Sequence, residues 1–388
     1  MQKPFTVHEW GTFLAIAGSD GVTLEGMSHE EHPLPDFVHT HEKNKDNVFP
    51  KFITLKGETP VIYFYTDRPR KVQLGVDFPT GLWTHWFPSA VRVGRYTGTD
   101  PTRSGHIGWV AQIAPPSPQD LLPEISPDSL WRFARQVPRA ATVQMTASAL
   151  LLEEKGSQTL AGSGETERFL FYRGLGRANL PVQFFPEKNG GRLVASVPVQ
   201  RVIVVSVEQG KLTWKPIIGL KAGQTLEGVR TRLRPGTVEE IARYLTRGLI
   251  QSGLFPDEAA ALVNTWRSSY FEHDGLRVLF ILPQTWTETF IPMRLSPKPD
   301  QLVRVMVGRI EGLTVRREAQ VATAVRGFAA QPEKHFVTLA AQGRYLEPIL
   351  RRLAAQPTLR PLCEKLLGTE FVRTGKGDAT ALRNQLAL

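Results

Sequence analysis

Residues 27–41, MSHEEHPLPDFVHTH, place four histidines and three carboxylates within fifteen positions. Imidazole and carboxylate groups are the ligands that zinc, iron, manganese, copper and nickel prefer in proteins. His39 and His41 are two residues apart and would point to the same face of a strand. His29 and His32 are three apart and would share a face of a helical turn. We therefore expect this segment to carry chemistry.

The candidate metal ligands are His8, His29 and His39. His8 stands in VHEWGTF, just before the first expected hairpin, from where it could approach the same cluster. Glu30 and Glu31 are the candidate catalytic residues, either as an oxygen ligand, as a group that orients a ligand, or as a general base. Three protein ligands would leave a coordination position open for water or substrate. The expected cofactor is a divalent transition metal, zinc or iron first.

Histidine density carries this prediction, because no known metal motif is matched. Seven of the nine histidines fall within the first 106 residues. HEEH brings its second histidine one residue too early for the HExxH zinc helix. Two alternatives stay open at this point. The segment is a solvated loop with incidental histidines, as the polar run HTHEKNKDN indicates, or it is a polar substrate cleft without a metal.

A second cluster is GLWTHWFP, residues 81–88. On a strand, Trp83 and His85 share one face and Trp86 lies on the other. These residues either form an exposed platform for a sugar or an aromatic ligand, or pack within a sheet, which is the more frequent outcome for such side chains.

Composition narrows the class of protein. The chain has 388 residues, of which 41% are hydrophobic and 22% charged, and no apolar run approaches the length of a membrane span. The single cysteine, Cys363, excludes an intrachain disulfide and zinc held by several cysteines.

The net charge is +10, but residues 1–66 hold nine Asp/Glu against five Lys. The arginines are scattered, so a nucleic-acid partner is not expected. The sequence does not specify the substrate, which is either a small molecule or a polymer. It does not specify the oligomeric state either.

The expected fold class is α+β in three parts. Residues 1–234 read as a large antiparallel, sandwich-like β-rich domain that carries the His/Glu cluster, because short Val-, Tyr-, Phe- and Trp-rich runs are separated by Pro and Gly. Residues 235–312 read as a mixed α/β segment that begins with a capping box from Thr237 to Glu240. Residues 313–388 read as a helical C-terminal segment of basic character.

Five stretches, HEWGTF, GMSHEEHPLPDFVH, ETPVIYFYT, ERFLFYRG and LVRVMVGR, resemble the signature stretches of a bacterial family of uncharacterised proteins. They run from residue 8 to about residue 310. Members of that family often carry an export leader ahead of the HEWGTF opening, so the resemblance slightly favours a mature exported, periplasmic form over a cytoplasmic one. It implies no activity.

Two functional hypotheses follow. The first is a metal-dependent enzyme with a His/carboxylate site, in which the metal activates water, so that hydrolysis is expected first and oxygen-using iron or copper chemistry second. The alternative is a non-catalytic β-sandwich protein that binds a polymer or a protein partner.

Overall fold

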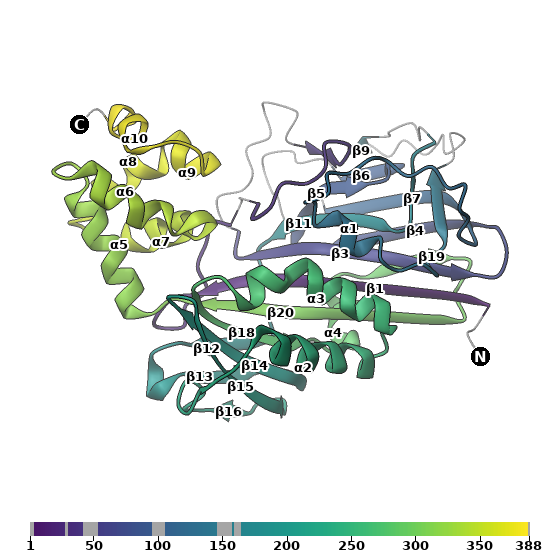
Figure 1. Ribbon diagram of the computed structural model, residues 1–388, viewed down its shortest axis with the longest axis horizontal. Coiled ribbons are helices and arrows are strands. Elements are labelled where there is room, and N and C mark those ends of the chain that lie inside the picture. Colours follow the sequence, from purple (N-terminus) through teal and green to yellow (C-terminus); the bar gives the residue numbers. More distant parts are fainter. Residues whose placement is uncertain are drawn as a thin grey trace.

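A computed structural model describes residues 4–27, 30–41, 53–94, 105–145, 157–158 and 164–386. The strands lie mainly in the N-terminal two thirds of the chain, and the C-terminal part is helical (Figure 1). The predicted α+β class with a β-rich, sandwich-like N-terminal region is confirmed. Within this described part, no helix combines the length and the apolarity that are needed to cross a bilayer.

The main sheet, sheet A, is mixed. Its centre is β1, whose thirteen residues are all buried; β1 pairs in parallel with β20 and antiparallel with β3. Strands from both sides of residue 234 enter this sheet, so the predicted boundary at 234 falls within it. The described strands, in spatial order, are β17 (Arg234–Pro235), β15 (Lys211–Leu220), β14 (Val199–Glu208), β18 (Gly275–Ile281), β20 (Gln301–Gly312), β1 (Phe5–Ala17), β3 (Leu55–Thr66), β11 (Leu170–Gly176), β5 (Gly81–Phe87) and β2 (His39–Thr40).

Two further sheets complete the β-rich part. In sheet B the order is β10 (Thr166–Glu167), β8 (Thr142–Met145), β7 (Gly105–Ala114), β4 (Arg70–Phe78) and β19 (Met293–Ser296), while β6 (Arg92–Gly94) pairs with β7 and with β9 (Ser157–Gln158). Sheet C consists of β12 (Val182–Phe185), β13 (Arg192–Ala195) and β16 (Thr225–Leu226), with a 3-10 turn, η3, at Lys188–Gly190. Apolar residues of sheets A and B share one core, as in a sandwich.

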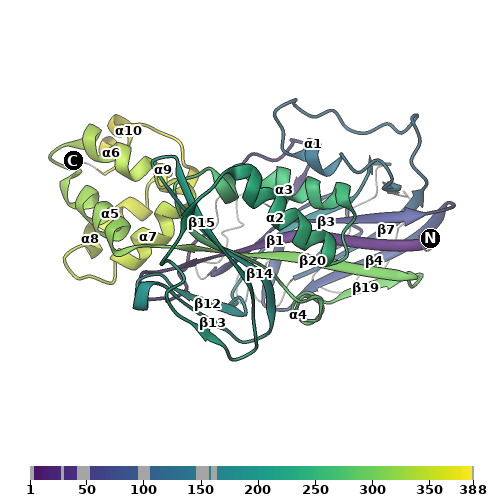
Figure 2. The ribbon, with the colours of Figure 1, turned by 60° about the horizontal axis from the view of Figure 1, so that its bottom comes forward.

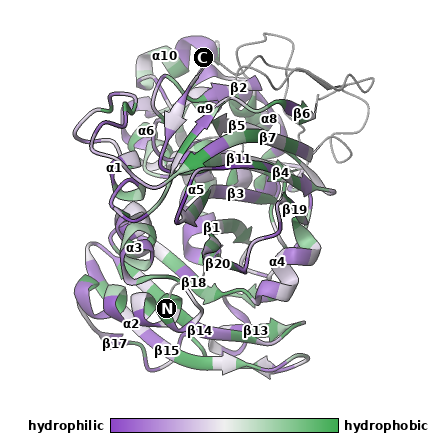
Figure 3. Ribbon diagram, turned by 90° about the vertical axis from the view of Figure 1, so that its right-hand side faces the viewer, coloured by the Kyte–Doolittle hydropathy of each residue, from purple (hydrophilic) through white to green (hydrophobic). Residues whose placement is uncertain are grey.

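Helices cover the other face of sheet A. Along β3, Ile62 and Phe64 enter the core shared with sheet B, whereas Val61, Tyr63 and Tyr65 enter the core beneath the helices. This alternation follows the two-residue period of a strand. The covering helices are α1 (Trp131–Ala134), α2 (Val238–Gln251) and α3 (Pro256–Phe271). Figures 2 and 3 show α2 and α3 on one side of sheet A, with sheet B and α4 (Gln284–Phe290) on the other.

The start of α2 is set locally, as predicted. The Thr237 side chain accepts a hydrogen bond from the backbone N–H of Glu240, and the Glu240 carboxylate accepts one from the backbone N–H of Thr237. This reciprocal capping box satisfies two backbone donors that a helix start otherwise leaves unpaired. The buried stripe of Ile241, Leu245 and Leu249 then faces β14 and its neighbours.

The C-terminal helices form a separate core, which includes the buried Cys363. They gather at the end of the molecule away from the N-terminus (Figure 1). This part packs against β1 through Leu14 and Ile16. Its elements are α5 (Val315–Gly327), α6 (Pro332–Ala340), η4 (Gly343–Tyr345), α7 (Leu346–Leu353), α8 (Arg360–Leu367), α9 (Glu370–Thr374) and α10 (Ala379–Gln385).

Candidate functional site

The two glutamates of the HEEH stretch are held by basic side chains. The Glu30 carboxylate pairs with Lys56 Nζ at 2.9 Å and with the Arg173 guanidinium. The Glu31 carboxylate pairs with Arg344, with Arg309 Nη1 at 3.5 Å and with His273 Nδ1 at 3.1 Å. Burial alone would raise the pKa of Glu31, but the two guanidinium groups outweigh burial and hold that pKa well below its usual range. The segment therefore joins sheet A, α3 and the C-terminal helices.

His8 lies in a closed cluster at the other end of α3. Its Nδ1 donates to Glu258 Oε2 at 2.8 Å, and Tyr65 donates its hydroxyl to Glu258 Oε1 at 2.6 Å. Glu258 also accepts from the backbone N–H of Phe255, so it caps α3. The aromatic rings of Tyr65 and Phe255 enclose the imidazole, which is fully buried. This cluster fixes α3 to the sheet.

His39 lies in a third, half-buried cluster. Its Nε2 is 2.9 Å from Glu165 Oε1 and 3.1 Å from Ser89 Oγ. Ser89 also donates its hydroxyl and its backbone N–H to Glu165 Oε2. Burial alone would raise the pKa of Glu165, but these hydrogen bonds lower it to about 2. Both Ser89 and Glu165 meet the same imidazole nitrogen, unlike a hydrolase triad, in which the nucleophile and the carboxylate use different nitrogens.

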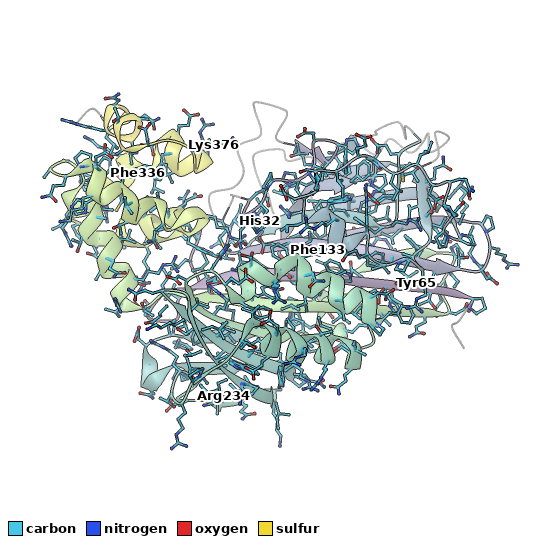
Figure 4. The ribbon with its side chains drawn as sticks, in the orientation of Figure 1. His32, Tyr65, Phe133, Arg234, Phe336 and Lys376 are labelled. Atoms are coloured by element: carbon cyan, nitrogen blue, oxygen red, sulfur yellow. The ribbon has the colours of Figure 1, made fainter. Side chains whose placement is uncertain are left out.

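The predicted metal ligands are thus placed in separate clusters where the structure describes them. His8 pairs with Glu258 near the start of α3, and Glu31 pairs with His273 just after its end; Figure 4 shows Tyr65 and His32 correspondingly far apart along that helix. From Glu258 to Ser269, eleven residues of helix span about 16 Å. His29 lies outside the described residues. Among the described ones, no group of three or more His, Cys, Asp or Glu could hold a metal. The metal site stays a prediction, which elemental analysis of the purified chain tests.

The expected alternatives for GLWTHWFP are resolved in favour of packing. Trp83, His85 and Trp86 are at most 7% exposed, so the expectation of an exposed platform is wrong. Trp83 donates its indole N–H to the carbonyl of Val76 on sheet B. Burial, with Lys56 nearby, lowers the pKa of His85 to about 3.

Beside the HEEH segment, the strand pairing of sheet A is irregular around residues 57–61 of β3, and we call this irregular stretch the fault. The pairing of β1 with β3 shifts between Trp10 and Thr12, and the pairing of β11 with β3 shifts between Phe171 and Gly174. β11 and β5 shift at the same level. At the centre of the fault, Thr59 has a φ of 44°, in the left-handed region that a β-branched residue rarely adopts. Such strain costs about 1–3 kcal/mol and concentrates at functional sites.

A pocket of about 40 Å³ lies at this fault. The sheet supplies its floor, α3 supplies one wall, and the loop 30–35 and the turn before α1 cover it. Most of the surface is aromatic or aliphatic, and the polar groups are few, as is typical of ligand sites. The principal lining residues are Trp10, Glu30, Glu31, His32, Leu34, Glu58, Thr59, Val61, Trp131, Phe171, Arg173, Thr265 and Trp266.

Several buried polar atoms of the lining residues have no hydrogen-bond partner within the described part of the chain. They are Trp10 Nε1, Glu58 Oε2, Thr59 Oγ1, Arg173 Nε and Trp266 Nε1. Glu58 is 1% exposed and Arg173 is 4% exposed, so bulk water does not reach them readily. Arg344 pairs with the other oxygen of Glu58. Burial, with Arg344 nearby, lowers the pKa of Arg173 to about 9.

His32 adds an imidazole at the rim of the pocket. Its Nε2 is 3.4 Å from Ser269 Oγ on α3. Burial lowers the pKa of His32, so the ring is neutral at neutral pH and can donate or accept a hydrogen bond.

The sequence predicts the residues of the HEEH segment that line this pocket, but it does not predict the lining residues that come from strands β3 and β11. Glu30 and Glu31 line it, as does His32. Glu58, Thr59 and Arg173 come from GETP and from FLFYRG, stretches that read as ordinary strands. One local signal is available, because a proline inside a strand, here Pro60, marks an edge or a bulge.

Comparisons with known proteins give little that bears on this site. No family model and no curated protein matches the chain. Among solved structures, a match is the Mu homology domain of Fcho1 from Danio rerio with a bound Eps15 peptide, at 8% identity and a TM-score of 0.28, covering 81% of this chain and 98% of that one. A similarity at this level supports no conclusion about fold or function.

Proposed function

We propose that this chain binds a small organic molecule in the pocket at the fault of sheet A. Glu58 and Arg173 would hold the polar end of the ligand, and the rings of Trp10, Trp131 and Trp266 would enclose its apolar part. The observation that carries the proposal is the coincidence, at one place, of a strained Thr59 and of buried charged groups with unused hydrogen-bonding atoms.

The unpaired atoms and the strained backbone of this pocket destabilise the folded chain when no ligand is bound. A buried polar atom without a partner costs about 1–3 kcal/mol, and more when the group is charged. The strand GETP could avoid the strain at Thr59 with glycine, and an apolar residue at position 58 would leave no carboxylate oxygen without a partner. A ligand that accepts from Arg173 and donates to Glu58 offsets these costs when it binds.

Binding at this place also suits acid–base chemistry. The carboxylate of Glu58 and the neutral imidazole of His32 line one small pocket, together with Glu30 and Glu31, which are held in ion pairs. A general acid or base must lie within hydrogen-bond reach of the reacting atom, and a ligand here would lie within reach of several such groups. Catalysis is an extension of the binding proposal and needs no metal ion.

A fragment screen read by NMR tests the proposal. The eight tryptophans give eight indole N–H resonances, of which Trp10, Trp131 and Trp266 report on the pocket and Trp214, on β15, serves as an internal control. We expect fragments that shift the pocket resonances, leave Trp214 unchanged, and bind at least about tenfold more weakly to Glu58→Gln.

Glu364→Gln, an exposed position on α8, is the matched control and should bind as the wild type does. The proposal is wrong if no fragment selects the pocket resonances, or if Glu58→Gln binds every such fragment with unchanged affinity.

A further inference from the structure

We infer that the group which enters this pocket is neutral and carries a hydrogen-bond donor beside an acceptor, as a carboxamide does. The inference rests on the proposed function and names the class of ligand. It concerns the inserted end of the molecule, whatever the rest of the molecule is.

The charges at the pocket are already paired. Glu30 is paired with Lys56 and Arg173, and Glu58 with Arg344. Arg344 and Arg309 also hold Glu31. The four cations outnumber the three carboxylates by one, but each cation already has a partner. A ligand with a net charge would lose its hydration on entering, so its transfer would be costly. A neutral group avoids this cost.

The unused atoms form a matched donor and acceptor. Glu58 Oε2 can only accept, and Arg173 Nε can only donate. They stand on neighbouring strands within one irregular stretch, between the pairs Val61–Phe171 and Gly57–Gly174. A carboxamide can donate its N–H to Glu58 and accept from Arg173 with its carbonyl.

Charged isosteres would satisfy only one of the two. A carboxylate would bring a second negative oxygen against Glu58 Oε2. An amidinium would bring a positive charge against Arg173 and leave its Nε without an acceptor. Carboxylate, carboxamide and amidinium have nearly the same planar shape, so the pocket separates them by charge and hydrogen bonding rather than by size.

The dimensions also fit a small planar group. A cavity needs about 10–15 Å³ for each water-sized occupant, so about 40 Å³ accommodates roughly the three heavy atoms of a carboxamide. The cavity holds only this group, so an attached ring or chain would extend outward past the loop 30–35.

Benzamide, benzoate and benzamidinium are the probes, titrated into the full chain while the indole resonances and the heat of binding are recorded. We expect benzamide to bind at least about tenfold more tightly than either ion, with shifts at Trp10 and Trp266. Glu58→Gln supplies an amide N–H in place of the carboxylate oxygen, so benzoate should gain affinity and benzamide should lose it. Glu364→Gln should keep the wild-type order.

Other results overturn the inference. If benzoate or benzamidinium binds the pocket as tightly as benzamide, the pocket is a ligand site, as the proposed function states, but the ligand class is wrong. If the order of affinities is the same in Glu58→Gln, Glu58 does not recognise the amide N–H. If none of the three probes shifts the pocket resonances, the amide class is excluded, and the wider fragment screen decides the proposed function separately.

Discussion

Glu258 and Glu58 are two buried carboxylates on the helix-covered side of sheet A, and they differ in how completely they are bonded. Glu258 accepts hydrogen bonds from His8, from Tyr65 and from the backbone N–H of Phe255. Glu58 pairs with Arg344 through one oxygen, and its other oxygen has no partner in the described part of the chain. Both oxygens of Glu258 are bonded within the protein, although His8 Nε2 has no partner among the described residues, whereas Glu58 Oε2 is left for a ligand.

The comparison separates a structural role from a functional one. The bonds from His8 and Tyr65 join β1 and β3 to the start of α3, and the bond from Phe255 caps that helix, so the effect of Glu258 should appear in stability. No described group of the protein bonds to Glu58 Oε2, so a change at this oxygen should affect ligand binding more than stability. The following predictions test this division.

The largest effect is expected for Glu258→Gln. The amide N–H₂ of glutamine would face donors, so at least one of His8, Tyr65 and the N–H of Phe255 would lose its acceptor in the core. Unfolding in urea should show a loss of roughly 2–4 kcal/mol. Affinity for benzamide, measured where the variant is folded, should stay within about twofold of the wild type. A loss of stability below about 1 kcal/mol would remove the structural half of the comparison.

Glu58→Gln should give the opposite pattern. Benzamide affinity should fall at least about tenfold, because a charged acceptor is replaced by a donor at the ligand. Stability should fall by about 1 kcal/mol, since Arg344 keeps its pairing with Glu31. Titration calorimetry and urea unfolding of the same preparation measure both quantities. If this variant loses as much stability as Glu258→Gln and keeps its affinity, the two carboxylates have the same role.

A smaller effect concerns the His39 cluster, which is neither closed nor part of the pocket. The pKa of Glu165 is about 2 in the folded chain, below its ordinary value of 4.5. A depressed carboxyl pKa contributes stability that is present above 4.5 and is lost as the pH falls toward 2. Glu165→Gln should therefore show a shallower loss of stability between pH 4.5 and 2 than the wild type, by acid titration of the unfolding midpoint. Parallel curves would show that Glu165 does not contribute.

The smallest effect is expected at Thr59. Glycine adopts its φ of 44° without strain, so Thr59→Gly should raise the free energy of unfolding by up to about 1 kcal/mol. The same change removes a hydroxyl from the pocket and should weaken benzamide binding. Thr54→Gly, at a position outside the pocket, should lower stability and leave binding unchanged. An unchanged or lower stability in Thr59→Gly would mean that the fault stores no strain.

The sequence predicts features that depend on neighbouring residues. The capping box of α2 involves two residues three positions apart, and the alternation along β3 involves residues two apart. The histidine-rich segment likewise leads to Glu30 and Glu31, two members of the pocket.

Features that depend on distant residues could not be predicted. His8 pairs with a residue 250 positions away, and β1 pairs with β20 almost 300 positions later. From the sequence, we expect His8 and His39 in one cluster. In the fold, His8 pairs with Glu258 and His39 pairs with Glu165. Arg344 reaches Glu31 and Glu58 only because the C-terminal helices pack against the end of sheet A.

A crystal structure of the chain with benzamide tests the central claim most directly. We expect the carboxamide between β3 and β11, with its nitrogen about 2.9 Å from Glu58 Oε2 and its oxygen at a similar distance from Arg173 Nε. A structure in which benzamide is absent from the pocket, and Glu58 Oε2 bonds to another group of the protein, would contradict it.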